Sequence, residues 1–226
     1  MRLILFLFTS ILLSSCVNYK KHITPSYDRL ARSHRKIAVL PIHFEGKTFP
    51  KKITKAQVDS ILLVENQFVQ NAIYFELLRH SGRDDNDIQI EIMPIQSSNR
   101  ALTEAGFSLL GIKDIPNQEL KRILGVDAVL STEINGDMFF HSTKDDIFKN
   151  ILNSVFWLPV VSDPILFDIK NLNVVSVFIQ TELVDLQNES VIWGFRKNRN
   201  LQLDQKNTDL AKQLAKDVRR RFPYRQ

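Results

Sequence analysis

Cys16 is the residue whose chemistry the sequence indicates most directly, because it is the only cysteine in the chain. It ends the tetrapeptide Leu13-Ser14-Ser15-Cys16, which has the pattern of a bacterial lipobox. A single cysteine excludes a disulfide within the chain, and its place directly after an apolar leader favours acylation over a role as a nucleophile. We therefore predict that Cys16 becomes the lipidated N-terminus, carrying fatty acyl groups such as palmitate.

The segment before Cys16 has the composition of a secretory leader. Arg2 is followed by an apolar run over residues 3–13 and then by small residues at a cleavage point. A membrane-spanning helix would need about 20 apolar residues. We predict a signal peptide at 1–15 that is removed; an ordinary cleaved leader with a stray cysteine, or an uncleaved leader, stays open. Val17 stands where lipoproteins kept on the inner membrane carry aspartate, so we expect the outer membrane.

Candidates for acid–base or metal chemistry are few. His43 and Glu45 are two positions apart at a strand end, so they share one side of the strand and could assist a proton transfer or supply two metal ligands. Glu133 and Asp137 are carboxylates near the end of a later strand. The chain has no Gly-rich phosphate loop, no Gly-x-Ser-x-Gly and no His-Glu-x-x-His. We expect no catalytic residue, no cofactor and no metal.

Composition is typical of a globular protein, with 44% hydrophobic and 24% charged residues in 226. The formal net charge of +5 is a mild excess, concentrated near the proposed anchor and at the C-terminal end. Basic clusters of this kind suit anionic lipid head groups, and we expect no nucleic acid as a partner outside the cytoplasm. Length and composition predict one domain at 36–226, preceded by a lipid-anchored flexible tether at 16–35.

Apolar spacing predicts the elements of this domain. Thr54 and Gln57 form a capping box at the start of a long helix that ends near His80. Gly125 follows another helix as its terminator. The predicted strands are 36–42, 88–95, 126–134, 174–185 and 190–197. The predicted helices are 54–80, 99–110, 116–124 and 206–222, and Asn99 is expected to cap the second of them. Strands separated by helices predict parallel pairing, so the fold class is α/β (α+β), a mixed sheet of about five strands in the order β-α-β-α-α-β-insertion-β-β-α.

Residues 136–173 do not fit this alternation and are predicted to be an insertion. The segment is rich in aromatic and aliphatic residues but is interrupted by Lys149, Asn150, Pro159 and Asp163, so it is not a spanning helix. It could be a surface that binds a partner or touches a membrane, or a short helix and loop folded over one edge of the sheet.

Several stretches together resemble a known family. They are 36–42 (Lys-Ile-Ala-Val-Leu-Pro-Ile), 124–130 with Glu133 after it, 175–185, 190–193 (Ser-Val-Ile-Trp) and 221–224 (Arg-Phe-Pro-Tyr). The chain resembles uncharacterised envelope lipoproteins that are distantly similar to the curli-secretion channel lipoprotein and to the N-terminal domain of the Tol-Pal propeller protein. The resemblance implies a single anticodon-binding-domain-like sandwich and carries over no active site. The insertion departs from the two barrel-forming hairpins of the curli channel.

These observations predict a lipid-anchored, non-enzymatic envelope protein, facing the periplasm of a Gram-negative bacterium, that binds other proteins in envelope assembly, transport or maintenance. Its expected working parts are Cys16, the sheet edge and the insertion. One alternative is an oligomeric secretion or pore component related to the curli channel, so a homo-oligomer stays open. Another is an envelope hydrolase or carbohydrate-binding lipoprotein, which would need a deep pocket lined by His43, Glu45 and Glu133.

Overall fold

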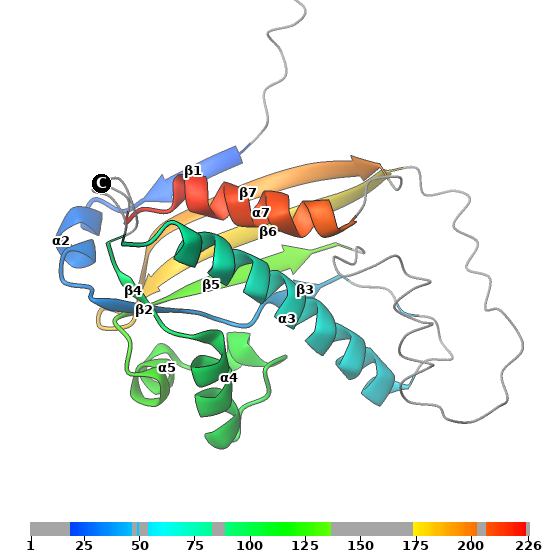
Figure 1. Cartoon of the computed structure of the whole chain (residues 1–226), viewed down its shortest axis with the longest axis horizontal. Coiled ribbons are helices and arrows are strands. Elements are labelled where there is room, and N and C mark those ends of the chain that lie inside the picture. The colour runs from blue at the N-terminus through cyan, green and yellow to red at the C-terminus, as the bar shows by residue number, and fades with distance from the viewer. Residues whose placement is uncertain are drawn as a thin grey trace, which may run out of the picture.

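The computed structural model describes residues 19–46, 49, 54–82, 89–136, 174–202 and 207–224 (Figure 1). They form one mixed sheet with helices packed on it, which confirms the predicted α/β sandwich. The strands are β1 (Tyr19–Ile23), β2 (Lys36–Val39), β3 (His43–Glu45), β4 (Glu91–Ile92), β5 (Ala128–Asn135), β6 (Val174–Asp185) and β7 (Ser190–Gln202). The helices are α2 (Tyr27–Ala31), α3 (Lys55–Arg79), α4 (Ile95–Glu104), α5 (Asn117–Leu124) and α7 (Asn207–Arg221), with a 3-10 turn η1 at Ile112–Asp114.

The sheet combines a parallel half and an antiparallel half. Its strand order is β1-β7-β6-β5-β2-β4, and β3 continues beside β5 after β2 ends. β2 pairs in parallel with β4 and β5, as predicted for strands joined through helices. β5, β6, β7 and β1 pair antiparallel. The described part of the chain therefore holds a 7-stranded sheet, not about five strands, since β1 and β3 were not expected as strands.

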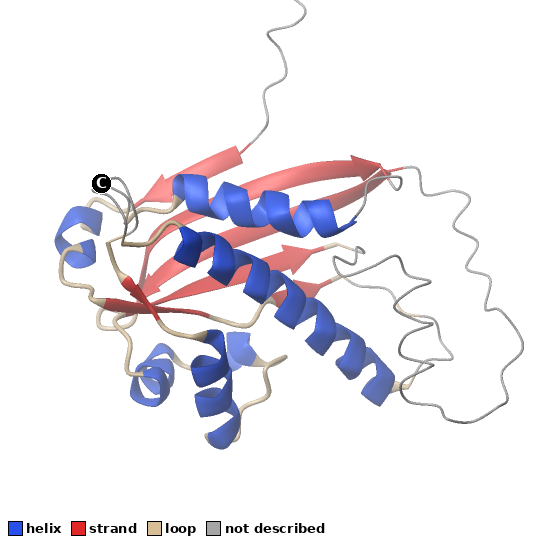
Figure 2. Cartoon of the chain, viewed as in Figure 1, coloured by secondary structure: helices blue, strands red, loops and turns tan. Residues whose placement is uncertain are grey.

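Helices cover both faces of β2 and β5, which explains why the sequence of β2 is a continuous apolar run rather than an alternating one. Ile37 and Val39 belong to a core with α3 and α7, whereas Ala38 and Leu40 belong to a second core with α4 and α5. Figure 2 shows α3 and α7 side by side over the sheet, with α4 and α5 grouped apart from them.

Helix α3 begins as the sequence predicts. The Thr54 side chain accepts a hydrogen bond from the Gln57 amide, and the Gln57 side chain accepts one from the Thr54 amide, so the capping box is confirmed. The helix ends at Arg79, with His80 as its C-cap. Gly125 ends α5 with φ 59°, a left-handed conformation that favours glycine.

Polar side chains of α3 are buried against the end of β2. Pro41 interrupts the strand, so backbone groups around it lack ladder partners. Asn66 Oδ1 accepts a hydrogen bond from the Ile42 amide at 2.8 Å, and Gln70 Nε2 donates to the Val39 carbonyl at 2.9 Å. Both side chains are almost fully buried. They satisfy backbone groups that the short β4 does not reach.

Residues 19–35 were predicted to belong to a flexible tether, and this prediction is wrong because they are folded onto the domain. Tyr19–Ile23 forms β1, which pairs with β7 at one edge of the sheet, and Tyr27–Ala31 forms α2. The Tyr27 hydroxyl donates to the Pro223 carbonyl at 2.7 Å, and the Thr24 amide donates to the Ile192 carbonyl at 3.2 Å. Pairing with a free strand edge uses the backbone, so a polar segment without hydrophobic period can join a sheet.

Two predicted elements between α3 and α5 differ from the structure. The strand expected at 88–95 is limited to β4, and Ile95 opens helix α4. Asn99 does not cap a helix running to Leu110: it lies inside α4 and its Nδ2 donates to Gln70 Oε1 at 3.0 Å. Pro94 takes the N-cap position, so the helix begins at Ile95, before Asn99.

The C-terminal part follows the prediction closely. β6 and β7 form the expected hairpin, with β7 reaching Gln202 rather than 197. Buried on the α7 side are Val177, Ile179, Leu183, Trp193 and Phe195. Helix α7 buries Ala211, Leu214, Ala215 and Val218 against them. The insertion beyond Gly136 lies outside the described residues. No helix in the part of the chain that the structure describes is long and apolar enough to cross a membrane.

Candidate functional site

The structure brings together three of the four acid–base candidates that the sequence singled out. β3 lies parallel to β5 with His43 opposite Glu133 and Glu45 opposite Asn135, so all four side chains share one face of the sheet. His43 Nε2 lies 3.2 Å from Glu45 Oε1. Asn135 Nδ2 donates to Glu45 Oε2 at 3.4 Å. His43, Glu45 and Glu133, which the hydrolase alternative would need around a deep pocket, therefore lie close together, while Asp137 lies outside the described residues.

Lys113 completes this cluster and was missed by the sequence analysis. It belongs to η1, and its Nζ lies 2.9 Å from Glu45 Oε1 and 3.0 Å from Glu133 Oε2. No motif or spacing relates η1 to the sheet, since the contact depends on how the chain between α4 and α5 folds over β5. We name His43, Glu45, Lys113 and Glu133 the β3–β5 polar cluster.

Two groups of the β3–β5 polar cluster, Glu45 and Lys113, have pKa values that are moved away from neutral pH. The hydrogen bond from Lys113, followed by that from His43, holds the pKa of Glu45 below its usual value. The same bonds to Glu45 and Glu133 raise the pKa of Lys113. A general acid or base works best with a pKa near the operating pH. An ionised Glu45 beside a charged Lys113 is better suited to holding η1 on the sheet than to transferring protons.

Substitution of Lys113 by glutamine is expected to return the pKa of Glu45 towards its ordinary value, because the largest cause of the lowering is removed. Titration of the Glu45 carboxyl carbon by NMR measures this directly. Arg100→Gln, at an exposed position on α4, is the matched control and should leave Glu45 unchanged. An unaltered Glu45 titration in Lys113→Gln would show that the ion pair does not form in solution.

A second polar cluster is buried where the C-terminal segment meets the start of β2. His34 Nε2 lies 2.6 Å from Asp185 Oδ2, and His34 Nδ1 is hydrogen bonded to the Tyr224 hydroxyl. Asp185 Oδ1 also accepts from Nδ2 of Asn188 in the β6–β7 turn at 2.9 Å. The His34 and Asp185 side chains are each 2% exposed. We name His34, Asp185 and Tyr224 the C-terminal triad.

Burial and hydrogen bonds shift the pKa values of Tyr224 and Asp185 in the C-terminal triad. Burial, then Tyr27 and the carboxylates of Asp185 and Asp127, raise the pKa of the Tyr224 phenol, which is hydrogen bonded to His34 Nδ1. Burial alone would raise the pKa of Asp185, but hydrogen bonds from the Asn188 amide and from His34 outweigh it and hold the pKa low. His34 Nε2–H therefore donates to a carboxylate, which fixes the imidazole between the chain's end and the hairpin turn.

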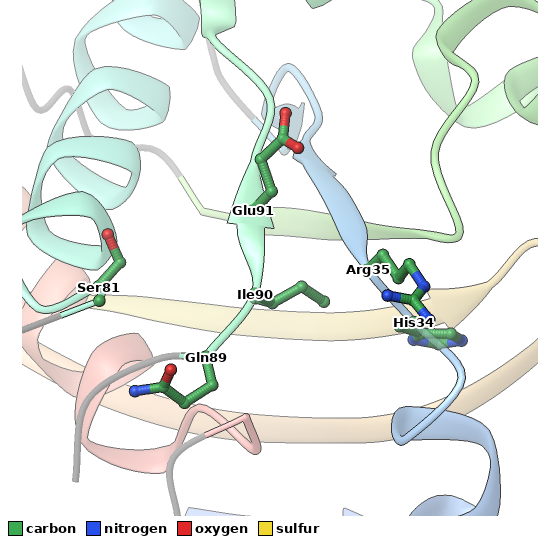
Figure 3. Close-up of a pocket in the computed structure, with 7 residues that line it drawn as sticks. His34, Arg35, Ser81, Gln89, Ile90 and Glu91 are labelled. Atoms are coloured by element: carbon green, nitrogen blue, oxygen red, sulfur yellow. The ribbon is translucent and has the colours of Figure 1, made fainter. Parts of the chain in front are cut away.

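A pocket of about 400 Å³ opens beside the C-terminal triad (Figure 3). It is lined by His34, Arg35, Ser81, Gly82, Gln89, Ile90 and Glu91. Its walls come from the start of β2, the end of α3 and the segment leading into β4. The buried nitrogens of His34 are already engaged by Asp185 and Tyr224. The hydrolase alternative expected a deep pocket at His43, Glu45 and Glu133, and this pocket lies elsewhere on the sheet.

The β3–β5 polar cluster is not a metal site. The part of the chain placed by the structure contains no cluster of three or more His, Cys, Asp or Glu side chains that could hold a metal ion. Cys16, with Leu13, Ser14 and Ser15, lies outside the described residues, so the lipid attachment stays a prediction.

The largest exposed apolar side chains of the described chain concentrate on α3. Val64, Phe75 and Leu78 are 37%, 54% and 42% exposed. Their spacing of 11 and 14 residues places them on one side of a helix with 3.6 residues per turn. The opposite side carries the fully buried Val69, Ile73 and Leu77. We name Val64, Phe75 and Leu78 the α3 apolar stripe.

Comparison with known proteins gives no family assignment. No protein-family model matches the chain, and no curated protein matches it. Among solved structures, the PelC dodecamer from Paraburkholderia phytofirmans is 14% identical over 89% of this chain and 94% of its own, with a TM-score of 0.41. The lipoprotein GNA1162 from Neisseria meningitidis is 16% identical over 81% and 94%, with a TM-score of 0.39. The C-terminal domain of LpoB from Escherichia coli is 11% identical over 77% and 93%, with a TM-score of 0.32. At these values no function is carried over, and the expected relation to the curli channel stays a prediction.

Proposed function

We propose that this chain is a lipid-anchored protein of the bacterial cell envelope that acts by binding another protein through the α3 apolar stripe, and that it catalyses no reaction. The lipobox ending at Cys16 supports the anchor. The exposure of the α3 apolar stripe is the single observation that carries the binding role. We also propose that the protein is anchored in the outer membrane and that its folded domain faces the periplasm.

Exposure of the α3 apolar stripe to water is unfavourable in free energy. Burial of apolar surface contributes about 25 cal/mol per Å², so Val64, Phe75 and Leu78 together offer a favourable contact to a partner. Single exposed apolar residues are normal on a protein surface, but three on one line of one helix are a more specific signal. Gln67 and Asn71 lie on the same side of α3 and place no charge at the centre of the stripe. A partner with its own apolar helix face fits this surface.

The arrangement of the two polar clusters supports a binding role over catalysis. In the β3–β5 polar cluster, Lys113 forms direct ion pairs with both Glu45 and Glu133. In the C-terminal triad, the imidazole of His34 is fixed between Asp185 and Tyr224 with both nitrogens in use. Each cluster joins segments that are distant in sequence, so each can be explained by its contribution to the stability of the fold.

A photo-crosslinking amino acid placed at position 75 tests the binding role in intact cells. We expect it to give a discrete adduct with a second envelope protein, because Phe75 is the most exposed member of the α3 apolar stripe. The same amino acid at Lys121, an exposed residue of α5 on the other side of the sheet, is the matched control and should give none.

The mass of the adduct separates the proposal from its alternative. An adduct at position 75 that joins two copies of this chain would favour the oligomeric secretion component instead. Equal adducts at positions 75 and 121, or none at 75, would contradict a binding site on α3.

A further inference from the structure

The distance between the proposed anchor and the folded domain is short. β1 begins at Tyr19, which is the third residue after Cys16. Since each residue spans at most about 3.6 Å, the start of β1 can stand at most about 11 Å from the α-carbon of Cys16. β1 is hydrogen bonded to β7 along its whole length, from Tyr19 opposite Lys197 to Ile23 opposite Trp193. An acylated Cys16 would therefore hold this edge of the sheet against the bilayer.

Helix α7 lies over the same edge of the sheet. Lys197, the β7 residue opposite Tyr19, is hydrogen bonded to Asp217 of α7, and Arg221 one turn further on lies over the Phe195 ring. Figure 1 shows α7 running in front of β7, next to β1. The anchored end of β1 and the outer face of α7 are thus parts of one border of the domain.

This border carries basic side chains. Lys212, Lys216 and Arg220 are exposed and four residues apart, so they form a row along the outer face of α7. Lys21 is exposed on β1 opposite Phe195, so it lies on the face of the sheet that α7 covers. Among the side chains that the structure describes in β1 and α7, the one carboxylate is Asp217, which is buried and bonded to Lys197 and Arg221. We name Lys21, Lys212, Lys216 and Arg220 the basic border.

We propose that the basic border lies on the phosphate groups of an anionic phospholipid bilayer, so that the domain rests on the membrane in one orientation. This inference depends on the proposed anchoring at Cys16. Lysine and arginine near a bilayer surface are attracted to anionic head groups, and an acyl anchor combined with a basic surface binds membranes more firmly than either signal alone. The short connection makes the bilayer, rather than a distant partner, the surface that these charges meet.

Fluorescence quenching at single positions tests the orientation. The acylated full-length protein is purified in detergent and placed in vesicles of phosphatidylethanolamine and phosphatidylglycerol that contain a head-group spin label as quencher. Cys16 is the only cysteine and its thiol is blocked by the lipid, so an introduced cysteine takes the fluorophore alone. A fluorophore on Gln213→Cys in α7 reports how close the basic border is to the head groups. Gln118→Cys on α5 is the matched control, because it is an exposed helical glutamine on the other side of the sheet.

We expect quenching at position 213 to exceed that at position 118 by at least about threefold, since quenching requires contact with the head groups. Charge reversal at Lys212, Lys216 and Arg220 to Glu should remove this excess, whereas reversal at Arg100, Lys121 and Arg122 should not. Replacing phosphatidylglycerol with zwitterionic phosphatidylcholine should also reduce the excess.

The outcomes separate this inference from the function on which it rests. Protein that floats with vesicles but is quenched equally at positions 213 and 118 would overturn the orientation and leave the anchor in place. An excess at 213 that is the same in zwitterionic vesicles would overturn the role of anionic lipid. Protein that fails to float with vesicles would overturn both the anchor and this inference.

Discussion

Asp217→Ala is expected to lower the free energy of unfolding by about 3–5 kcal/mol, because it leaves a buried lysine without its counter-ion. Lys197 is 8% exposed on β7, and its ammonium is bonded to the Asp217 carboxylate of α7. Arg221 Nη1 donates to the same carboxylate at 3.1 Å. Removal of Asp217 therefore leaves two cations facing each other in a largely dry layer between α7 and the sheet. Denaturant unfolding, followed by far-UV circular dichroism, measures the loss.

A double variant supplies the control for Asp217→Ala. Lys197→Met together with Asp217→Leu removes both charges at similar volume, and replacing a buried ion pair by packed apolar groups is often close to neutral. We expect the double variant to unfold within about 1 kcal/mol of the wild type. A double variant as unstable as Asp217→Ala would show that the loss comes from packing or from Arg221 rather than from the unpaired lysine.

Asp185→Ala is expected to lower the free energy of unfolding by about 3 kcal/mol, since it removes the acceptor at the centre of the C-terminal triad. The His34 Nε2–H and the Asn188 amide would both lose a partner in a buried place, and each unsatisfied donor costs about 1–3 kcal/mol. Tyr224→Phe keeps the ring and removes one hydrogen bond, so its loss should be smaller. Thermal and denaturant unfolding of both variants measure the difference, and a larger loss in Tyr224→Phe would contradict the central place of Asp185.

The folded state is expected to lose stability in acid through two buried carboxylates, Asp185 and Asp217. The folded-state pKa of Asp185 lies below its usual value, as does that of Asp217. The stability that these carboxylates contribute is therefore fully present above their unfolded pKa of about 4 and is lost as the pH falls through the lower folded value. The wild type should lose stability below about pH 4, and Asp185→Ala should lose less over the same range. Equal pH slopes for the two proteins would show that Asp185 is not stabilised in its ionised form.

The elements that were predicted correctly carry their signal within a few neighbouring residues. The capping box of Thr54 and Gln57 and the left-handed Gly125 are local, because each depends on backbone groups within one turn of the chain. The apolar run of β2 shows burial on both faces directly. The hairpin of β6 and β7 was found because its inward-facing residues alternate over its length.

The elements that were missed depend on contacts between distant segments. β1 is a strand because β7 offers an unpaired edge, and the polar residues Lys20, Lys21 and His22 give no sign of this. Asn99 looked like a cap, but its side chain bonds to Gln70 across α3 and α4.

The candidate sites likewise combine contacts that local spacing predicts with contacts that only the complete fold creates. His43 and Glu45 could be paired from their spacing, whereas the approach of Lys113, and the meeting of His34, Asp185 and Tyr224, depend on the complete fold.

The lipid anchor at Cys16 underlies both proposals, and metabolic labelling with an alkyne palmitate analogue, followed by separation of membranes from soluble protein, tests it. We expect the wild type to be labelled and to sediment with membranes. Cys16→Ala should be unlabelled, because the chain has no other cysteine, and should be recovered in part in the soluble fraction. A Cys16→Ala protein that is labelled, or that stays bound to membranes as firmly as the wild type, would contradict the lipid anchor.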